Sequence, residues 1–277
     1  MKNIRIAIIG AGAMGTAILD GLISNGMDVA NISVSTHTSA SARAIENKHV
    51  VAAFSLEEDS ANNLAAIDDA DVIILATKPY LVTEVLEGFI EPQLKPSALI
   101  ISVAAGITTA AMEAALPLGN PVVRAMPNTP AIVGRALTGI ALGSRATESH
   151  QKLAEELFAT VGKTIVVDES RIDALSTISG SGPAYVFFLV EQFITAARHQ
   201  GFSDDEAKLL VNETFLGATE LLVASRKEPA DLRRQVTSPN GTTMQAIARM
   251  EKSNLDQMFI EATDAALARA REIAAGK

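Results

Sequence analysis

Three glycines near the start of the chain have the spacing of a dinucleotide-binding turn. Gly10, Gly12 and Gly15 form a G-x-G-x-x-G pattern directly after the apolar run 4–9, and the alanine-rich run 13–19 follows them. The predicted order is therefore strand, glycine turn and helix, which is the context that this pattern requires. One glycine permits the turn, one lets the backbone approach a pyrophosphate, and one packs the helix against the strand. Free backbone amides at the helix start then face the phosphates.

The end of the second predicted strand, over 32–36, bears on which dinucleotide is bound. NAD-binding proteins usually carry a carboxylate here that binds the ribose 2′-hydroxyl. This chain has Thr-His-Thr-Ser at 36–39, so no acid in this stretch repels a 2′-phosphate. We therefore favour NADP(H), although the nearest arginine, Arg43, lies several residues further on. The alternative interpretation is that Thr38 or Ser39 only caps the next helix.

Three later strand ends carry polar or small residues. Leu-Ala-Thr-Lys-Pro at 75–79 places a lysine at one strand end, and Ser-Val-Ala-Ala-Gly at 102–106 lets a flat ring approach another. Open α/β sheets bind their ligands outside these ends. The alternative for the first stretch is a solvated lysine before a helix-starting proline. For Arg-Ala-Met-Pro-Asn-Thr-Pro at 124–130 the alternative is a stiff polar turn.

Two further stretches lie in the second half. Ser-Gly-Ser-Gly-Pro-Ala-Tyr at 179–185 opens a predicted helix but lacks the G-x-S-x-G pattern of a serine nucleophile, so we favour close packing as its role. Val-Thr-Ser-Pro-Asn-Gly-Thr-Thr-Met at 236–244 places hydroxyls and backbone amides at a helix start, which suits a small carboxylate. The alternative for this stretch is an ordinary capping turn, which local physics alone favours.

These stretches require a particular order of elements. Up to residue 167, apolar runs alternate with amphipathic helical patterns, which predicts a Rossmann-like, doubly wound parallel sheet. Beyond it only helical spacing is found. We therefore predict a dinucleotide-binding domain over 1–167 and an all-helical substrate-binding and dimerisation domain over 168–277. The predicted strands are 4–9, 32–36, 50–53, 72–77, 98–104, 121–126, 137–142 and 164–167. The predicted helices are 13–26, 60–70, 80–88, 108–116, 148–161, 183–200, 203–226, 241–251 and 254–275.

The composition of the 277 residues argues against several classes of protein. Hydrophobic residues make up 48% and charged residues 20%, an ordinary globular balance. A net charge of −9, two tyrosines and no tryptophan argue against a nucleic-acid surface. No cysteine is present for a disulfide, a thiolate nucleophile or a zinc–thiolate site. No apolar run reaches the ~20 residues of a membrane span, and the first apolar run leads into the glycine turn rather than a signal-peptide cleavage site. We expect a cytoplasmic protein.

The helical half is strongly apolar for its size. Val186, Phe187, Phe188 and Phe193 crowd one segment. A small helical domain with apolar residues on more than one face often buries one of them against a second subunit. We therefore expect a homodimer, which is also the commonest symmetric assembly.

Six of these stretches, in this order, resemble the pyrroline-5-carboxylate reductase family, the last enzymes of proline biosynthesis. They are GAGAMG, LATKP, SVAAG, RAMPNTP, SGSGPAY and VTSPNGTTMQAI, and they extend over nearly the whole chain. The last stretch is highly specific, whereas the glycine pattern is not. Asn240 is a departure, because many relatives have glycine there. The resemblance implies hydride transfer from NAD(P)H to a cyclic imine, which gives L-proline.

The resemblance also implies roles for particular residues. The residues expected to bind NADPH, with NADH as an alternative, are Ile9, Gly10, Ala11, Gly12, Ala13, Met14, Thr36, Asn63, Ala76, Thr77, Lys78, Pro79, Val103, Ala104 and Ala105. The residues expected to bind the substrate are Ser238, Asn240, Gly241, Thr242 and Thr243. Thr243 is expected to reach the ring nitrogen and is the predicted catalytic residue. Helical domains of the family interlock as dimers, and in several members five dimers form a ring.

Reduction of a protonated imine needs little acid–base machinery, because the carbon is already electrophilic and the cofactor supplies the difficult chemistry. We assign no catalytic or metal role to the four histidines. One rival interpretation is a β-hydroxyacid dehydrogenase, which needs a catalytic lysine in the helical half, where Lys208 is the only early candidate. The other is a regulator that binds NADP(H) without turnover.

Overall fold

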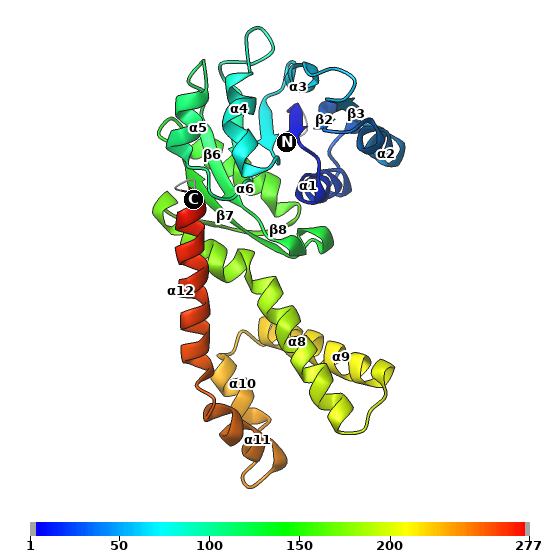
Figure 1. The fold of residues 1–277 in the computed structure, drawn as a ribbon, viewed down its shortest axis with the longest axis vertical. Coiled ribbons are helices and arrows are strands. Elements are labelled where there is room, and N and C mark those ends of the chain that lie inside the picture. The colour runs from blue at the N-terminus through cyan, green and yellow to red at the C-terminus, as the bar shows by residue number, and fades with distance from the viewer. Residues whose placement is uncertain (1–3, 275–277) are drawn as a thin grey trace. The chain divides into compact units, whose positions relative to one another are not determined.

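The computed structural model describes residues 4–274, which form two compact units (Figure 1). The first comprises residues 4–181 together with 267–274, and the second comprises Gly182–Ala266. The first unit therefore extends beyond residue 167, where the sequence places the end of the dinucleotide-binding domain. That functional boundary stays a prediction.

Eight strands of the first unit form one sheet in the order β3-β2-β1-β4-β5-β6-β7-β8. The strands are β1 (Ile6–Ile9), β2 (Ile32–Thr36), β3 (Ala52–Ser55), β4 (Val72–Leu75), β5 (Leu99–Ser102), β6 (Val122–Met126), β7 (Ala136–Leu142) and β8 (Gly162–Val166). The first six are parallel and have the strand order of a dinucleotide-binding fold, so the predicted doubly wound sheet is confirmed. β7 runs antiparallel to β6, because only residues 127–135 connect them and a parallel crossover needs about a dozen residues or more.

Helices cover both faces of this sheet. They are α1 (Ala13–Ser24), α2 (Ser39–His49), α3 (Asn62–Ile67), α4 (Val82–Glu87), α5 (Thr109–Ala115) and α6 (Glu148–Ala159). Side chains alternate along β1, so that Ile6 and Ile8 belong to one core cluster with residues of α1, α2 and α6. Ala7 and Ile9 belong to the other, with residues of α3, α4 and α5. Burial on both faces explains why the strands read as continuous apolar runs.

The helix α2 is missing from the sequence-based prediction. Its pattern is weakly apolar, and only Ala42 and Ile45 are buried. Thr38 caps this helix, because its Oγ1 accepts a hydrogen bond of 3.2 Å from the amide of Ser41. Thr38 therefore acts as a helix cap.

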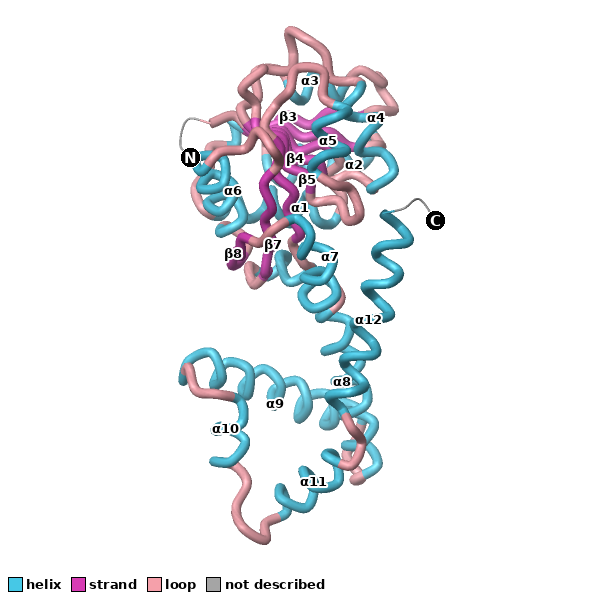
Figure 2. The backbone as a smooth tube through the Cα atoms, turned by 90° about the vertical axis from the view of Figure 1, so that its left-hand side faces the viewer, coloured by secondary structure: helices cyan, strands magenta, loops and turns pink. Residues whose placement is uncertain are grey.

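Every regular element after β8 in the described chain is a helix (Figure 2). The first unit continues with α7 (Ile172–Leu175) and a π-helix at Ser176–Gly180. The second contains α8 (Gly182–His199), α9 (Asp204–Ser225), α10 (Pro229–Gln235), α11 (Thr242–Glu251) and most of α12 (Leu255–Ala274). The predicted helical character is confirmed, although α10 is an addition, and residue 275, the predicted end of the last helix, lies outside the described residues. None of the helices within 4–274 has the length and apolar character needed to cross a membrane.

Candidate active site

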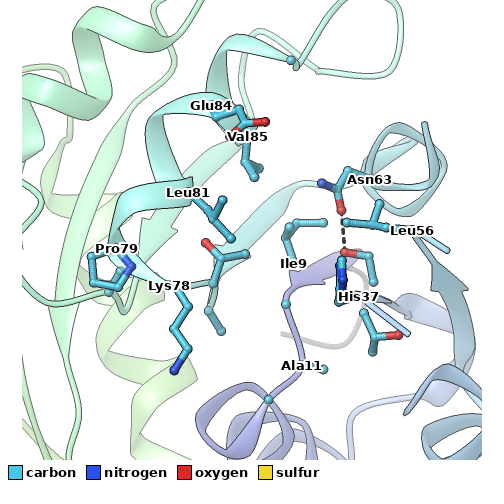
Figure 3. Close-up of a pocket in the computed structure, with 18 of the residues that line it drawn as sticks. Ile9, Ala11, His37, Leu56, Asn63, Lys78, Pro79, Leu81, Glu84 and Val85 are labelled. Carbon is cyan, nitrogen blue, oxygen red and sulfur yellow. Dashed lines mark hydrogen bonds between the residues drawn. The ribbon is translucent and has the colours of Figure 1, made fainter. Parts of the chain in front are cut away.

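A cavity of about 1170 Å³ opens at the carboxyl ends of β1, β2, β4 and β5 (Figure 3). Drug-sized ligands usually occupy about 300–1,000 Å³, so this cavity has room for a dinucleotide. All fifteen residues expected to bind the cofactor line it, although they come from five separate parts of the sequence. The lining also includes His37, Thr38, Ser41 and Leu56, which the resemblance does not imply.

The three glycines of the first turn have different surroundings. Gly10 has φ +85°, and a Cβ on it would lie 2.7 Å from Cγ2 of Thr77. A Cβ on Gly15 would lie 3.1–3.3 Å from atoms of Gly10, Ala76 and Ile8, so this glycine allows close packing of helix and strand. A Cβ on Gly12 would meet nothing within 4 Å. Gly12 therefore leaves open space beside the backbone on the cavity wall.

The start of α1 is held in place but not capped. The amides of Gly10 and Ala11 both donate to the carbonyl oxygen of Ser35, at 3.0 and 3.1 Å, which ties the turn to β2. Gly12 is the N-cap and provides no side-chain acceptor for the amides of the first turn. Amides at a helix start carry partial positive charge and no intrahelical partner, so they are suited to bind a phosphate. The backbone amides at the start of α1 are therefore the kind of hydrogen-bond donors that bind a pyrophosphate.

Polar side chains organise the β2 end of the cavity. Ser35 Oγ donates a hydrogen bond of 2.7 Å to Asn63 Oδ1, which orients the amide group of Asn63 (Figure 3). Thr36 Oγ1 donates to the carbonyl oxygen of Thr38 at 3.0 Å. This end of the cavity is therefore built from hydroxyl and amide groups, as expected for the adenosine part of a dinucleotide.

The wall formed after β4 and β5 differs in character. Lys78 is an exposed cation on the cavity lining, and Glu84 is the only acid among the lining residues. The stretch Val103–Ala105 contributes small side chains, and the amide of Ala104 donates to Ser102 Oγ at 3.2 Å. This wall combines one positive and one negative charge with small apolar side chains that a flat ring can contact.

The residues expected to bind substrate form one turn in the second unit. Asn240 has φ +59°, the left-handed conformation that glycine adopts freely and asparagine tolerates better than most residues. This explains why Asn240 can stand where many relatives have glycine. Gly241 is the N-cap of α11 and offers no side-chain cap, so Thr242 and Thr243 begin the helix with amides available for an anion.

Comparison with known proteins decides the family. A family model described as pyrroline-5-carboxylate reductase dimerisation matches residues 169–273, and one described as NADP oxidoreductase, coenzyme F420-dependent, matches residues 5–106. A pyrroline-5-carboxylate reductase of Pseudomonas aeruginosa is 38% identical over 275 residues, which cover 99% of this chain and 98% of the relative. The chain belongs to the pyrroline-5-carboxylate reductase family.

Solved structures of pyrroline-5-carboxylate reductases agree over the full length. The enzyme of Coxiella burnetii has a TM-score of 0.90 and 35% identity, with 98% of each chain covered. The pyrroline carboxylate reductase of Plasmodium falciparum, solved with NADP bound, has a TM-score of 0.84 and 26% identity, with 99% of each chain covered. The similarity therefore includes the cavity-bearing unit as well as the helical one.

As in the matched dimerisation region of the reductase family, the helices of this chain are suited to self-association. α8 has no buried residue, and Phe187, Phe188 and Leu209 are 63%, 57% and 64% exposed. Within the unit, Phe193 of α8 packs edge-on against Phe215 of α9, with ring centroids 6.2 Å apart. Apolar area of this extent marks an interaction surface, and the matched dimerisation region indicates a second copy as its partner.

A buried charge cluster in this reductase was not anticipated from the sequence. Arg124 on β6 is 3% exposed, and it pairs with Asp173 at 2.7 Å and with Glu169 at 3.8 Å. Glu169 also accepts hydrogen bonds of 2.6 Å from the amide and the hydroxyl of Thr109. A charged residue inside an apolar strand was the available signal, since such a residue needs partners. Asn128 in the next turn bonds to the carbonyl oxygen of Ser179 and the amide of Leu137, so that turn has a structural role.

The lysine required by the rival dehydrogenase interpretation is engaged elsewhere. Lys208 Nζ lies 2.5 Å from Asp204 Oδ2 one turn earlier on α9, and its side chain is 52% exposed. The hydrogen bond that Lys208 donates to Asp204 raises the pKa of Lys208 above its ordinary value. A protonated lysine paired on a solvated helix face is not placed to act as a base.

Proposed function

We propose that this chain reduces 1-pyrroline-5-carboxylate to L-proline with NADPH as hydride donor, the last step of proline biosynthesis, and that it also accepts NADH. One observation carries the proposal. Fifteen residues from five parts of the sequence converge on a single dinucleotide-sized cavity in a chain of the pyrroline-5-carboxylate reductase family. The NADP in the related Plasmodium falciparum structure supports the choice of coenzyme.

The proposed coenzyme site uses backbone groups at one end and side chains at the other. The amides at the start of α1 bind the pyrophosphate, while Thr36 and Asn63 bind the adenosine part. Lys78 adds a positive charge for the anionic coenzyme, and Val103–Ala105 contacts the nicotinamide. Bound NADPH supplies the hydride. The task of the lining residues is to hold the ring and exclude water.

The proposed substrate site is the turn at 238–243. Its backbone amides bind the substrate carboxylate, and the hydroxyl of Thr243 bonds to the ring nitrogen and fixes the face of the imine. Hydride transfer requires this turn, from the same chain or from a second copy, to deliver the imine carbon to within about 3–3.5 Å of the nicotinamide. If the imine binds protonated, no side chain has to supply a proton, which fits a site built from hydroxyls and amides.

The proposed assembly is a homodimer through the helical domain over 168–277, with five dimers forming a ring. The exposed apolar residues of α8 and α9 support the dimer. A cytoplasmic location stays a prediction from the sequence.

The deciding experiment adds 1-pyrroline-5-carboxylate to the purified protein with NADPH. Loss of NADPH absorbance with formation of proline is the expected result. Absence of this reaction, together with oxidation of a hydroxyacid by NAD(P), would establish the dehydrogenase instead. Coenzyme binding without turnover of either substrate would indicate the regulator.

A further inference from the structure

An acidic side chain reaches the start of α2 from a different part of the sequence. Glu57 lies in the loop after β3, and its Oε2 accepts a hydrogen bond of 2.8 Å from the amide of Ser39, the first residue of α2. The backbone amide of Glu57 donates to the carbonyl oxygen of His37 at 3.1 Å and to Ser55 Oγ at 3.2 Å. Several bonds therefore fasten the loop after β3 to the loop after β2, and the carboxylate is held in one place.

This carboxylate lies at the margin of the proposed coenzyme cavity. The cavity lining includes His37, Thr38 and Ser41, which flank Ser39 in the chain, and Leu56, which precedes Glu57. The end of β2 is where dinucleotide-binding folds recognise the 2′ position of the adenosine ribose. The sequence shows no acid at the end of β2, but the fold supplies one there from the loop after β3.

We propose that Glu57 sets the coenzyme preference of this reductase by lowering the affinity for NADPH relative to NADH. The inference rests on the proposed function, since it concerns the same cavity. The 2′-phosphate of NADPH, a phosphate monoester, carries about −1.5 to −2 charges near neutral pH. Its binding partners would be the amides and hydroxyls at the start of α2. Glu57 occupies the first of these amides and repels the phosphate, whereas the 2′-hydroxyl of NADH brings no charge to the same place.

The neighbouring charges strengthen this assignment. Glu58 and Asp59 follow Glu57 in the same exposed loop, so the loop after β3 carries three consecutive acids. On the other side, Arg43 Nε donates to the carbonyl oxygen of Ser39 at 3.4 Å, which places one cation in the first turn and a half of α2. Arg43 attracts a 2′-phosphate and Glu57 opposes it, so that removal of Glu57 leaves the attraction unopposed.

The test is the ratio of the dissociation constants of NADH and NADPH, measured by calorimetry. Glu57→Gln keeps the shape and still accepts the amide of Ser39, but it removes the charge. Because the group is exposed and partly screened, we expect a gain of roughly fivefold in preference for NADPH at low salt, shrinking at high salt. Glu58→Gln is the matched control, because it makes the same charge change one residue away in a side chain that forms no hydrogen bond within the described structure. It is expected to change the ratio by less than about twofold.

The inference alone would be overturned if both coenzymes bind with a ratio that Glu57→Gln leaves unchanged, or if Glu58→Gln changes the ratio equally. Glu57→Asp keeps the charge and shortens the reach to Ser39, so it is expected to stay near the unsubstituted ratio. If Glu57→Asp changes the ratio as much as Glu57→Gln does, the contact with Ser39 and not the charge sets the preference, and the inference is overturned. Failure of the unsubstituted protein to bind either coenzyme would instead overturn the proposed function, and this inference with it.

Discussion

Replacement by alanine is predicted to have different effects at two glycines of the first turn. At Gly12 it should weaken NADPH binding, and at Gly10 it should lower the stability of the fold. Gly12 has φ −76°, and its Cβ would enter open space on the cavity wall. Gly12→Ala should therefore change the free energy of unfolding by less than about 1 kcal/mol, since a smaller unfolded-state entropy offsets a slightly poorer helix cap. The new methyl group occupies space that the pyrophosphate needs, so the dissociation constant of NADPH should rise about tenfold, or about 1.4 kcal/mol.

Gly10→Ala should instead destabilise the fold. A left-handed backbone costs an alanine about 1–2 kcal/mol, and the forced contact with Thr77 adds about 1–3 kcal/mol, so a loss of about 2–5 kcal/mol is expected. Urea unfolding measures the stability, and calorimetry with NADPH measures the affinity. Thr77→Ser removes Cγ2 and should recover part of the loss in the double variant, but not all of it, since the backbone amide of Thr77 also lies 3.0 Å from the added Cβ.

The reasoning would be refuted by either of two results. One is a large stability loss in Gly12→Ala, which would mean that the added Cβ does not enter open space. The other is unchanged NADPH affinity in a folded Gly12→Ala protein, which would mean that the pyrophosphate does not approach the start of α1.

Three further predictions concern the substrate turn, the buried cluster and the acid limb of stability. Thr243→Ala should lower turnover at least about tenfold while leaving the NADPH dissociation constant within about twofold, as steady-state kinetics and calorimetry would show; equal losses in both would contradict its role at the ring nitrogen. Arg124→Met should cost about 2 kcal/mol in urea unfolding, less than the about 3–5 kcal/mol of a fully buried pair, because its partners are 27% and 29% exposed; a loss below about 0.5 kcal/mol would contradict the cluster's structural role. Lys95 lowers the pKa of Asp69, so the contribution of Asp69 to stability is present above the ordinary carboxyl value of 3.8 and is lost as the pH falls below it. Asp69→Asn should therefore flatten the fall in melting temperature over that acid range, and an unchanged slope would show that the pair adds nothing.

The strand-end residues were predictable because parallel topology fixes where they go. Once β1, β2, β4 and β5 are recognised as buried parallel strands, their carboxyl ends must lie along one edge of the sheet. Ile9, Thr36, Ala76 and Val103 follow from this rule, and the structure places all four on one cavity. Asn63 is different, because its place depended on the family resemblance rather than on a strand end.

The features that escaped the sequence depend on contacts between distant residues. Glu57 and Ser39, which share a hydrogen bond, are eighteen residues apart in the sequence. Arg124 and its partner Asp173 are forty-nine residues apart. No local pattern specifies such pairs. The reversal of β7 and the weakly apolar α2 were missed for a related reason, since a connection length and a hydroxyl cap decided them rather than the apolar period. The sequence correctly shows no acid within 36–39. It does not show that Glu57, from the loop after β3, brings a negative charge to Ser39.

The helix starts at the two proposed anion sites lack a side-chain cap, whereas several other helix starts have one. α2, α5 and α9 are capped by the side chains of Thr38, Thr108 and Ser203, which occupy the amides of the first turn. α1 and α11 have glycine at the N-cap and no side-chain cap. A glycine N-cap costs a few tenths of a kcal/mol relative to a capping side chain, because the first amides lack that acceptor. A bound anion offsets this cost, because it accepts the hydrogen bonds that no side chain accepts. The proposed reaction involves two anionic groups, the pyrophosphate of the coenzyme and the carboxylate of the imine.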